Sequence, residues 1–377
     1  MTSSPHGYFD YNATTPPASS ALEAWSDSMA SGWHNPSSLY RDAAAAKQRL
    51  EDLREDLADW LDCDEPERII WTAGATEANN AVLRHFAVRG ETVAVSAVEH
   101  PCVAAPAADW FPPDRLGVLP VDPATGAVDP GDAFRTIEHQ RPALVSVMAA
   151  NNETGALQPW REIAAICRDH EIPFHCDAAQ WIGKLPSTGL SECDFLTGSA
   201  HKFGGPRGVG FLVVPNDFHD FHLATGGPQE GGRRAGTEDL AGVAALAAAL
   251  ANHDDASLGA QSAERAARRD RFEERIIESV GVRIPGRRGR RLWNTSLFIL
   301  PREKNLKWLT RLDRLGFAVS TGSACSAGRG NPSAVMAAMG LDFEEMGRVL
   351  RVSGGWDTSD EEWQELAAAL EEIDAAW

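Results

Sequence analysis

Residues 172–180 read Ile-Pro-Phe-His-Cys-Asp-Ala-Ala-Gln, and residues 195–202 read Phe-Leu-Thr-Gly-Ser-Ala-His-Lys. Each stretch starts with a short, largely apolar run that is typical of a buried strand, and each ends in polar side chains. Comparable runs with β-branched residues alternate with segments of helical spacing from about Ile69 to Val214. This alternation is the pattern of βαβ units, in which helices cover a mostly parallel sheet. The sequence therefore predicts an α/β fold.

The length of the chain predicts a second, smaller domain. The sequence has 377 residues, whereas single hydrophobic cores rarely grow beyond about 250–300 residues. From Asp254 to Ile277 the sequence becomes rich in Arg, Glu, Asp and Ala, which indicates a long, largely exposed helix. We therefore expect a large domain over residues 15–256. Residues 1–14 and 257–377 are expected to form a smaller α+β domain.

Two helices can be predicted in more detail. Segment 39–61 carries apolar residues at helical spacing, which indicates a face turned toward the core. These residues are Leu39, Ala43, Ala46, Leu50, Leu53, Leu57 and Trp60. Near the C-terminus, Ser359 and Glu362 have the spacing of a capping box at the start of a helix. That helix carries an apolar stripe formed by Trp363, Leu366, Leu370 and Ile373.

Composition excludes several classes of protein. No apolar run approaches the ~20 residues that a membrane helix needs, and the first residues, Met1 to Gly7, lack the basic flank and apolar stretch of a secretory signal. We therefore expect a cytoplasmic protein. The net charge of −19, from 54 acidic and 35 basic residues, argues against direct nucleic-acid binding and favours a small substrate or a basic partner.

The cysteines and one cluster of arginines receive ordinary interpretations. The six cysteines are scattered, without the close spacing of a structural zinc site or a redox dithiol, so no metal site is predicted and most are expected to be small buried hydrophobic residues. A basic cluster is interpreted as a solvated surface loop, with a docking patch as the alternative. Its members are Arg283, Arg287, Arg288, Arg290 and Arg291.

Polar side chains follow four of the predicted strands. In open α/β sheets, ligands bind beyond the carboxyl ends of the strands. Each residue has an ordinary explanation on its own, since His100 could be a hydrogen-bonded core residue and Asp177 could cap a helix. Four such sets at one edge favour a cofactor site instead. The sets are Glu99-His100, Asn151-Asn152-Glu153, Asp177-Ala178-Ala179-Gln180 and Ser199-Ala200-His201-Lys202.

A possible phosphate site precedes these sets. Segment 72–80 follows the strand-like run Ile69 to Trp71 and opens a helix that extends to about Val88. Small residues and Thr76 at a helix N-terminus leave backbone N–H groups free for a phosphate. A simple turn with a helix cap explains the same residues equally well.

Lys202 suggests the kind of cofactor. It is preceded by Ser199 and His201 and followed by Phe203 and two glycines, which is an unusual setting for a surface lysine. A lysine amine forms a Schiff base with an aldehyde, and pyridoxal phosphate also needs an acid opposite its ring nitrogen to become an electron sink. Asp177 meets that need, so the residues favour pyridoxal phosphate over an ordinary surface lysine.

Eight segments together resemble the cysteine desulfurases of the class V aminotransferase group, and the resemblance covers nearly the whole chain. The segments are Phe9-Asp10-Tyr11-Asn12-Ala13-Thr14-Thr15-Pro16, Gly74-Ala75-Thr76-Glu77, Glu99-His100, Asn151-Asn152-Glu153-Thr154-Gly155, Asp177-Ala178-Ala179-Gln180, His201-Lys202, Arg234-Ala235-Gly236-Thr237 and Ser323-Ala324-Cys325-Ser326. The resemblance implies fold type I of the pyridoxal-phosphate enzymes. In that fold a mixed, mostly parallel sheet of the seven-stranded type is flanked by helices.

The resemblance also implies roles at the cofactor ring. Lys202 would hold the cofactor as a Schiff base, and His100 would stack on the ring and shuttle protons. Asp177 would pair with the pyridine nitrogen and Gln180 would contact the phenolic oxygen. Asn152 would lie beside the ring and the substrate.

Further residues would hold the phosphate and the substrate. By the same resemblance, the phosphate would be bound by residues of the chain itself and by a threonine reaching across a homodimer interface. These residues are Ala75, Thr76, Ser199 and His201, with Thr237 from the second subunit. Arg351 looks like the clamp for the substrate carboxylate, where a bidentate guanidinium is suitable, and Asn35 would assist it.

Cys325 decides which reaction the resemblance implies. The freed Lys202 would remove the α proton of L-cysteine, and a thiolate at Cys325 would attack the substrate sulfur, giving a persulfide and alanine. The loop around Cys325 is rich in Ser, Gly and Ala, which predicts an exposed, mobile nucleophile rather than a buried structural cysteine.

Some features leave alternatives open. Ala200 and Thr154 stand where relatives often have glycine and an aliphatic residue. The chain ends at Trp377, whereas relatives that serve an iron–sulfur scaffold often carry a docking tail. The sulfur acceptor could therefore be such a scaffold, a thiolation protein or a DNA-modification partner. An aminotransferase, a selenocysteine lyase, a cysteine hydrolase and a non-catalytic regulatory partner are the rival functions.

Overall fold

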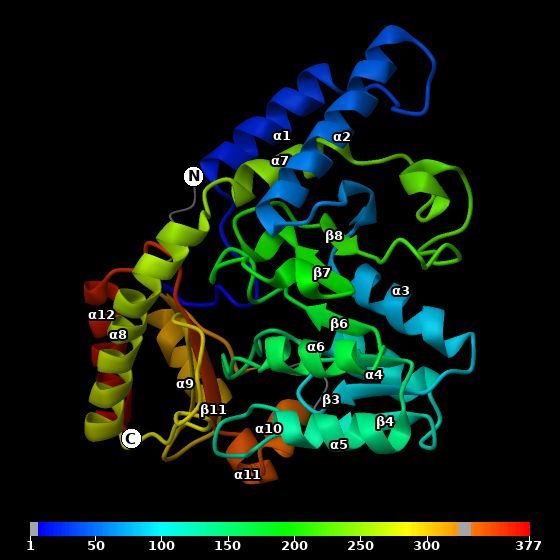
Figure 1. Ribbon diagram of the computed structural model, residues 1–377. Coiled ribbons are helices and arrows are strands. Elements are labelled where there is room, and N and C mark those ends of the chain that lie inside the picture. The colour runs from blue at the N-terminus through cyan, green and yellow to red at the C-terminus, as the bar shows by residue number, and fades with distance from the viewer. Residues whose placement is uncertain (1–6, 323–332) are drawn as a thin grey trace.

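The computed structural model describes residues 7–322 and 333–377 and contains a central mixed sheet of seven strands (Figure 1). Its strand order is β2-β8-β7-β6-β5-β3-β4. The strands are β2 (Ile69–Thr72), β3 (Val93–Ser96), β4 (Leu116–Leu119), β5 (Leu144–Ser146), β6 (Phe174–Asp177), β7 (Phe195–Ser199) and β8 (Gly210–Val213). Only β8 runs antiparallel to its neighbours β2 and β7. The predicted α/β class and the mostly parallel sheet are confirmed.

Helices cover both faces of this sheet, because successive strand residues point to opposite sides. Val93 and Val95 of β3 belong to an apolar cluster with helices α3 and α4, whereas Ala94 belongs to a cluster with α5, α6 and α7. The helices are α3 (Ala75–Ala87), α4 (Pro101–Trp110), α5 (Pro130–Gln140), α6 (Trp160–Asp169) and α7 (Leu240–Leu250). The two clusters bury the sheet and leave its carboxyl edge as the place where polar side chains can gather.

Two N-terminal helices, α1 (Ser19–Ser31) and α2 (Arg41–Leu61), pack against α7. The predicted apolar stripe of α2 is buried from Ala43 to Leu57. The prediction was wrong for Leu39, which is 102% exposed. The helix begins two residues later, at Arg41, so Leu39 lies in the preceding loop and cannot share the helical face.

The C-terminal part forms its own cluster around Phe272, Phe298, Leu350 and Trp363. Strands β9 (Thr295–Ile299) and β11 (Val349–Ser353) pair antiparallel, and β1 (Gly7–Tyr8) pairs with β10 (Phe317–Ala318). The helices here are α8 (Asp255–Ser279), α9 (Asn305–Arg314), α10 (Ala334–Ala338), α11 (Phe343–Met346) and α12 (Asp360–Ala375). The predicted capping box of Ser359 and Glu362 opens α12. The domain limits at residues 14 and 256 remain predictions.

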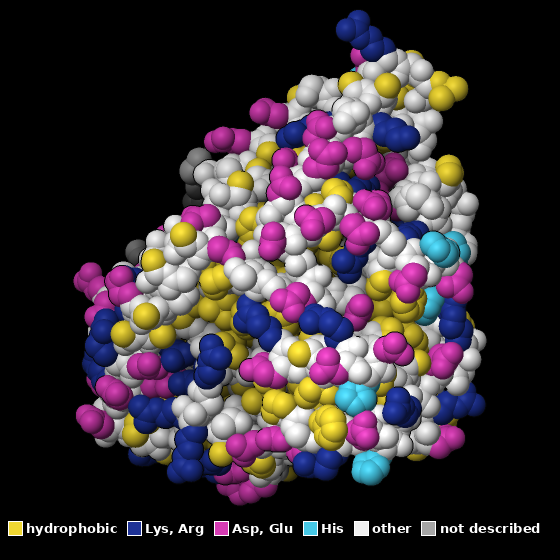
Figure 2. Space-filling model, viewed as in Figure 1, with side chains coloured by type: hydrophobic (Ala, Val, Ile, Leu, Met, Phe, Trp, Pro, Cys, Tyr) yellow, Lys and Arg dark blue, Asp and Glu magenta, His cyan; other side chains and the backbone are white. Residues whose placement is uncertain are grey.

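Short 3-10 helices complete the described fold. They are η1 (Pro66–Arg68), η2 (Leu190–Glu192), η3 (Ala200–Lys202) and η4 (Gln229–Gly232). Acidic side chains are spread over the face shown in Figure 2, as the net charge of −19 requires. Among residues 7–322 and 333–377, no helix combines the length and the apolar character that crossing a membrane demands.

The arginine cluster is only partly the solvated loop expected from its composition. Arg291 is buried and donates two hydrogen bonds, of 2.6 and 2.7 Å, to the buried carboxylate of Glu273 on α8. Arg287 lies 3.7 Å from the same carboxylate, and Arg283 pairs with Glu345. These arginines therefore hold the segment before β9 against α8 and α11.

Candidate active site

The carboxyl ends of β2, β3, β5, β6 and β7 open at one edge of the sheet, since these strands are mutually parallel. Four of the ends carry the polar sets predicted from the sequence, and the end of β2 carries the predicted phosphate segment.

Asp177 is the last residue of β6 and is buried. Its Oδ2 accepts a hydrogen bond of 2.7 Å from Nδ2 of Asn79 on α3. Its Oδ1 accepts one of 3.0 Å from the backbone N–H of Ala179. The carboxylate of Asp177 thus caps a local turn, which agrees with its ordinary interpretation as a cap. It is also held by the side chain of Asn79 from helix α3. Asn79 carried no signal in the sequence beyond its place in the phosphate segment.

His100 is the N-cap of α4. Its Nδ1 accepts a hydrogen bond of 3.2 Å from the backbone N–H of Cys102, so the proton of the neutral imidazole resides on Nε2. Burial lowers the pKa of His100, Asp177 opposes this shift, and Lys202 adds to it. The ring can therefore donate from Nε2 while remaining uncharged.

Cys102 lies inside the site, although the sequence indicated only a small buried residue. Its Sγ is 2.9 Å from Nδ1 of His100 and 3.1 Å from Nδ2 of Asn79. Burial, followed by the charge of Asp177, raises the pKa of the Cys102 thiol. A thiol that keeps its proton is a poor nucleophile, so Cys102 does not compete for the role assigned to Cys325.

Glu99, beside His100, is a structural residue. Its Oε1 accepts hydrogen bonds from the hydroxyl of Ser96 (2.6 Å) and the backbone N–H of Met148 (2.8 Å). These bonds join the end of β3 to the segment that follows β5. Burial raises the pKa of Glu99 to about 8.

Lys202 ends the 3-10 helix η3, directly after β7. Its Nζ donates to the backbone carbonyls of Asn12 (2.6 Å) and Ala13 (2.9 Å). Burial, and then the positive charge of Arg351, lowers the pKa of Lys202 to about 8. The unprotonated fraction of this amine near neutral pH is therefore far larger than that of an ordinary lysine, which suits a nucleophile for an aldehyde.

The predicted phosphate segment forms a narrow cradle at the start of α3. Gly74, the N-cap of α3, has a φ of 131°, a backbone conformation that residues with a side chain rarely adopt. A Cβ on Gly210 of β8 would lie 2.8 Å from Cα of Gly74, and one on Gly74 would lie 3.4 Å from Oγ of Ser199. The two glycines thus let β8 and Ser199 pack closely against the N-terminus of α3, whose first turn contains Ala75 and Thr76.

His201 stands next to this cradle. Its Nδ1 is 3.1 Å from Oγ1 of Thr14. Burial, then Lys202 and Arg207, lowers the pKa of His201 to about 4. His201 is therefore a neutral hydrogen-bonding group at neutral pH.

Arg351 reaches the site from β11. Its Nη2 donates to Oδ1 of Asp10 (2.6 Å) and its Nη1 to the carbonyl of Asn152 (2.9 Å). Nε of Arg351 and Oδ1 of Asn152 are buried, and neither has a partner among the described residues. These are the polar atoms that a bound molecule could satisfy.

Asn12 connects the surroundings of the sheet edge to the C-terminal part. Its Nδ2 donates to the carbonyl of Asn152 (3.1 Å) and to Oγ1 of Thr295 (2.8 Å). Its backbone N–H donates to Oγ of Ser353 (3.0 Å). Its carbonyl accepts from Nζ of Lys202 and from Nε2 of Gln180 (2.9 Å). Asn12 belongs to one of the segments that resemble the family, but the sequence predicted no role for it.

Three predicted residues are not brought to this centre within the chain. Asn35 lies in the loop between α1 and α2, and Figure 1 shows that loop far from β11, which carries Arg351. Thr237 is exposed in the loop between η4 and α7. Cys325 lies outside the described residues. Their roles remain predictions.

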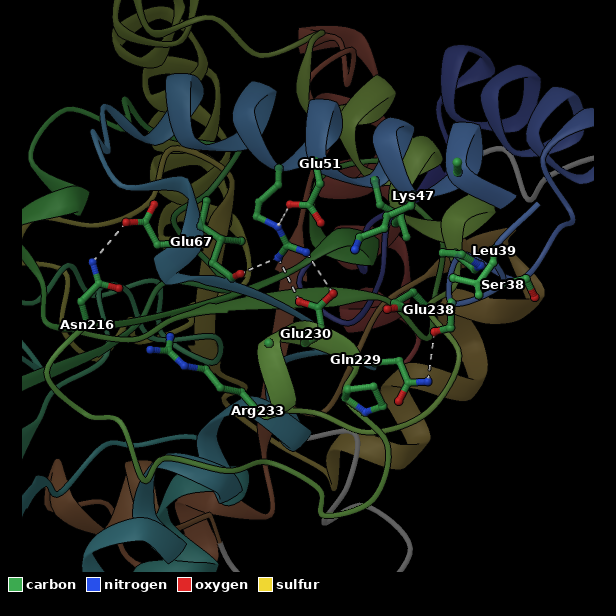
Figure 3. Close-up of a pocket in the computed structure, with 18 residues that line it drawn as sticks. Ser38, Leu39, Lys47, Glu51, Glu67, Asn216, Gln229, Glu230, Arg233 and Glu238 are labelled. Atoms are coloured by element: carbon green, nitrogen blue, oxygen red, sulfur yellow. Dashed lines mark hydrogen bonds and ion pairs between the residues drawn. The ribbon is translucent and has the colours of Figure 1, made fainter. Parts of the chain in front are cut away.

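The loop that carries Thr237 is anchored at Glu230, in a pocket between α2 and η4 (Figure 3). Glu230 accepts two hydrogen bonds from Arg54, of 2.9 and 3.0 Å, and one of 2.9 Å from the backbone N–H of Trp71. Both charged side chains are buried. The pair ties this loop to edge strand β2, a contact that the sequence pattern did not indicate.

Comparison with known proteins places this fold and site in a family. Residues 7–366 match the family model described as aminotransferase class-V. The chain is 33% identical to the cysteine desulfurase IscS of Dictyoglomus turgidum, covering 97% of this chain and 94% of that one. A NifS-like protein from Rickettsia africae superimposes with a TM-score of 0.87 at 28% identity, covering 97% and 98% of the two chains. A structure titled SspA in complex with cysteine has a TM-score of 0.79 and 29% identity, with coverage of 92% and 98%.

The strand-end lysine and carboxylate, on a mixed sheet of this topology, define an enzyme of the class V aminotransferase family. Within that family the chain belongs to the cysteine desulfurases. The family predicted from the sequence motifs is confirmed.

Proposed function

We propose that this enzyme binds pyridoxal 5'-phosphate through Lys202 and uses it to transfer sulfur from L-cysteine to Cys325 and then to an acceptor protein. The observation that carries the proposal is the buried amine of Lys202, whose pKa is lowered to about 8, in the electrostatic reach of the Asp177 carboxylate. An amine that forms a Schiff base and an acid for a ring nitrogen are the two groups that this cofactor demands.

The residues present fit the cofactor. The N-terminus of α3, which lies beside Ser199, suits a phosphate, because free backbone N–H groups and the helix dipole favour an anion. Ser199 and the neutral His201 stand beside it as hydrogen-bond donors. Bound pyridoxal phosphate would supply an electron sink for the bond-breaking step.

The remaining chemistry falls to the chain's own side chains. In this proposal the free amine of Lys202 would remove the α proton of L-cysteine. His100 would donate through Nε2, because its Nδ1 accepts a hydrogen bond from the backbone N–H of Cys102. Asp177 would pair with the ring nitrogen, Gln180 would contact the phenolic oxygen, and Asn152 would offer its Oδ1, which has no partner among the described residues.

Arg351 is the proposed clamp for the substrate carboxylate. Its guanidinium already binds one carboxylate, that of Asp10, through Nη2 at 2.6 Å, and its Nε has no partner among the described residues. A substrate carboxylate would exchange with Asp10 or add at Nε, since both arrangements use the same planar donors. The related SspA was solved in complex with cysteine, which supports L-cysteine as the substrate.

The sulfur transfer is assigned to Cys325. Its thiolate would attack the substrate sulfur, forming an S–S bond as the C–S bond breaks. The electron pair would remain with the substrate β carbon, which would take a proton to become the methyl group of alanine, and the α carbon would regain the proton that Lys202 removed. The persulfide on Cys325 then passes its outer sulfur to an acceptor protein, of which an iron–sulfur scaffold is one candidate. We propose the cytoplasm as the place of this reaction.

A homodimer is part of the proposal. Helix α1 and the loop after it expose Leu22 (56%), Trp25 (45%), Met29 (49%) and Trp33 (69%). Large apolar side chains gathered on one surface mark an interaction site. A second copy covering them would allow the exposed Thr237 to reach the phosphate of the neighbouring subunit.

The test uses purified protein incubated with L-cysteine and a reducing thiol, with alanine and sulfide measured together. The wild type should produce both, whereas Lys202→Ala and Cys325→Ser should release neither at more than a few per cent of its rate. Cysteine turnover at the wild-type rate by Cys325→Ser would refute the persulfide step. Consumption of a keto acid without sulfide would indicate an aminotransferase. Faster turnover of selenocysteine that survives loss of Cys325 would indicate a lyase.

A further inference from the structure

Lys184 is a buried lysine for which the reaction described above has no use. It follows β6 by seven positions and is 1% exposed. Its Nζ donates to Oδ1 of Asn12 at 2.9 Å and to Oε1 of Gln180. No described residue forms an ion pair with it, although lysines are rarely buried without a carboxylate partner. Its backbone carbonyl accepts from Nε1 of Trp293 (2.8 Å), which holds the segment in place.

The amine of Lys184 influences the orientation of the side-chain amides of Asn12 and Gln180, which both contact it. Whether it is charged or neutral, Nζ of Lys184 has protons to donate, and the atoms of Gln180 and Asn12 that face it are their oxygens. The NH2 group of Gln180 is then turned the other way, and it donates to the carbonyl of Asn12 at 2.9 Å. That carbonyl is also the acceptor for Nζ of Lys202. The amide of Gln180 thus brings its N–H groups to the side where Lys202 lies.

The NH2 group of Gln180 has two protons, and the carbonyl of Asn12 takes one of them. The second has no partner among the described residues, because the hydrogen bonds of Gln180 go only to Asn12 and Lys184. A donor is therefore left available next to the amine that would hold the cofactor.

We propose that Lys184 is a positioning residue, which fixes the amide of Gln180 so that an N–H and not the carbonyl faces the phenolic oxygen of pyridoxal phosphate on Lys202. This inference rests on the cofactor assigned above. It assigns Lys184 no contact with the cofactor or the substrate.

The consequence for the bound cofactor is electrostatic. An N–H donor stabilises negative charge on the phenolic oxygen, and it therefore lowers the pH at which the bound cofactor loses its exchangeable proton. An amide that turned its carbonyl to that oxygen would act in the opposite direction. Burial lowers the pKa of Lys184, and the positive charges of Lys202 and Arg351 lower it further. A charge at this position is therefore costly.

The experiment follows the visible absorbance of the holoenzyme as a function of pH. Lys184→Met keeps most of the apolar stem of the side chain but removes its donor. The midpoint of the titration should rise by about one pH unit, the value of one hydrogen bond to a charged group. Thr295→Val is the matched control, because it removes the buried hydrogen bonds of the Thr295 hydroxyl with Asn12 and Asn294 without touching Gln180. Its midpoint should equal that of the wild type.

A second background tests whether Lys184 acts through Gln180. In Gln180→Ala the midpoint should already be raised, and adding Lys184→Met should change it no further. An equal additional shift would show that Lys184 acts on the cofactor by its own charge, which would overturn the proposal. An unchanged midpoint in Lys184→Met, or an equal shift in Thr295→Val, would overturn it as well.

Two further outcomes are separated by design. If Lys184→Met does not fold, Lys184→Gln replaces it. That side chain is one atom shorter and loses one of the two contacts, so a smaller rise that depends on Gln180 is expected, and an unchanged midpoint refutes the inference. If the wild type shows no visible band with pyridoxal phosphate, the proposed cofactor is wrong. A normal wild-type band with no response to Lys184 refutes only the role of Lys184.

Discussion

Asn79 and Asp177, 98 positions apart in the sequence, meet in a buried hydrogen bond of 2.7 Å between Nδ2 and Oδ2. Asn79 comes from helix α3, whose N-terminus is the proposed phosphate cradle, and Asp177 ends strand β6. The bond therefore links the groups assigned to the two ends of the cofactor. A change in α3 would be felt at the ring nitrogen through this contact.

Replacing Asn79 by leucine should weaken both the fold and the site. Oδ2 of Asp177 would lose its side-chain donor in a buried position, which costs about 1–3 kcal/mol. We expect a lower free energy of unfolding in urea and weaker binding of pyridoxal phosphate to the cofactor-free protein. Val82→Ala, on the same helix but in an apolar cluster, is the control, because it lowers stability without removing a hydrogen bond of the site. Unchanged cofactor affinity in a destabilised Asn79→Leu would limit the role of this bond to stability.

The amine of Lys202 should react with the cofactor in a pH range set by its lowered pKa. Because the unprotonated amine is the nucleophile, the rate of pyridoxal phosphate attachment to cofactor-free protein should rise with pH through about 8, rather than through the ordinary 10.5. Arg351→Gln removes a positive neighbour that disfavours the ammonium, so this midpoint should move upward. Stopped-flow absorbance measures both. A wild-type midpoint near 10 would contradict the assignment.

Glu99 should make stability fall as pH rises. Its folded pKa of about 8 lies above the ordinary value of 4.5, so the folded state holds a proton that the unfolded state loses. Its contribution is present below pH 4.5 and is lost as pH rises through 8. Glu99→Gln keeps the acceptor for Ser96 and Met148, and it should flatten this decline by a few kcal/mol in urea unfolding curves between pH 5 and 8. An unchanged pH slope would contradict the assignment.

The buried pair of Arg54 and Glu230 should be expensive to break from one side. Arg54→Met leaves the Glu230 carboxylate buried without its two guanidinium donors, at a cost of about 3–5 kcal/mol in denaturant unfolding. The double variant Arg54→Met with Glu230→Gln should lose less than the sum of the single losses, since no unpaired charge remains. Additive losses would mean that the two side chains act independently.

Thiol labelling tests the special position of Cys325. The five described cysteines, Cys63, Cys102, Cys167, Cys176 and Cys193, are all buried. We expect a thiol reagent to modify one cysteine rapidly in the folded protein and all six after denaturation. Cys325→Ser should abolish the rapid phase, whereas Cys63→Ser should preserve it. A rapid phase that survives loss of Cys325 would contradict the predicted exposure.

The sequence by itself determined the fold class, because periods of two and of helical spacing are properties of neighbouring residues. It also determined which residue types follow each strand, and the capping box of Ser359 and Glu362 was readable because both partners lie within one turn. The same reasoning was wrong for Leu39, because helix α2 begins two residues later, at Arg41, and Leu39 lies in the preceding loop.

Only the tertiary structure decided which side chains meet. Lys184 and Asn12 are 172 positions apart, and Arg351 and Asp10 are 341 apart. Their contacts follow from how the N-terminal segment passes between the sheet edge and β11, which no local pattern encodes. Burial at those contacts also sets the charge states, since the low pKa of Lys202 results from surrounding residues that are distant in sequence. The sequence therefore identified Lys202 and Asp177 as candidates, whereas long-range packing brings them to the same edge of the sheet.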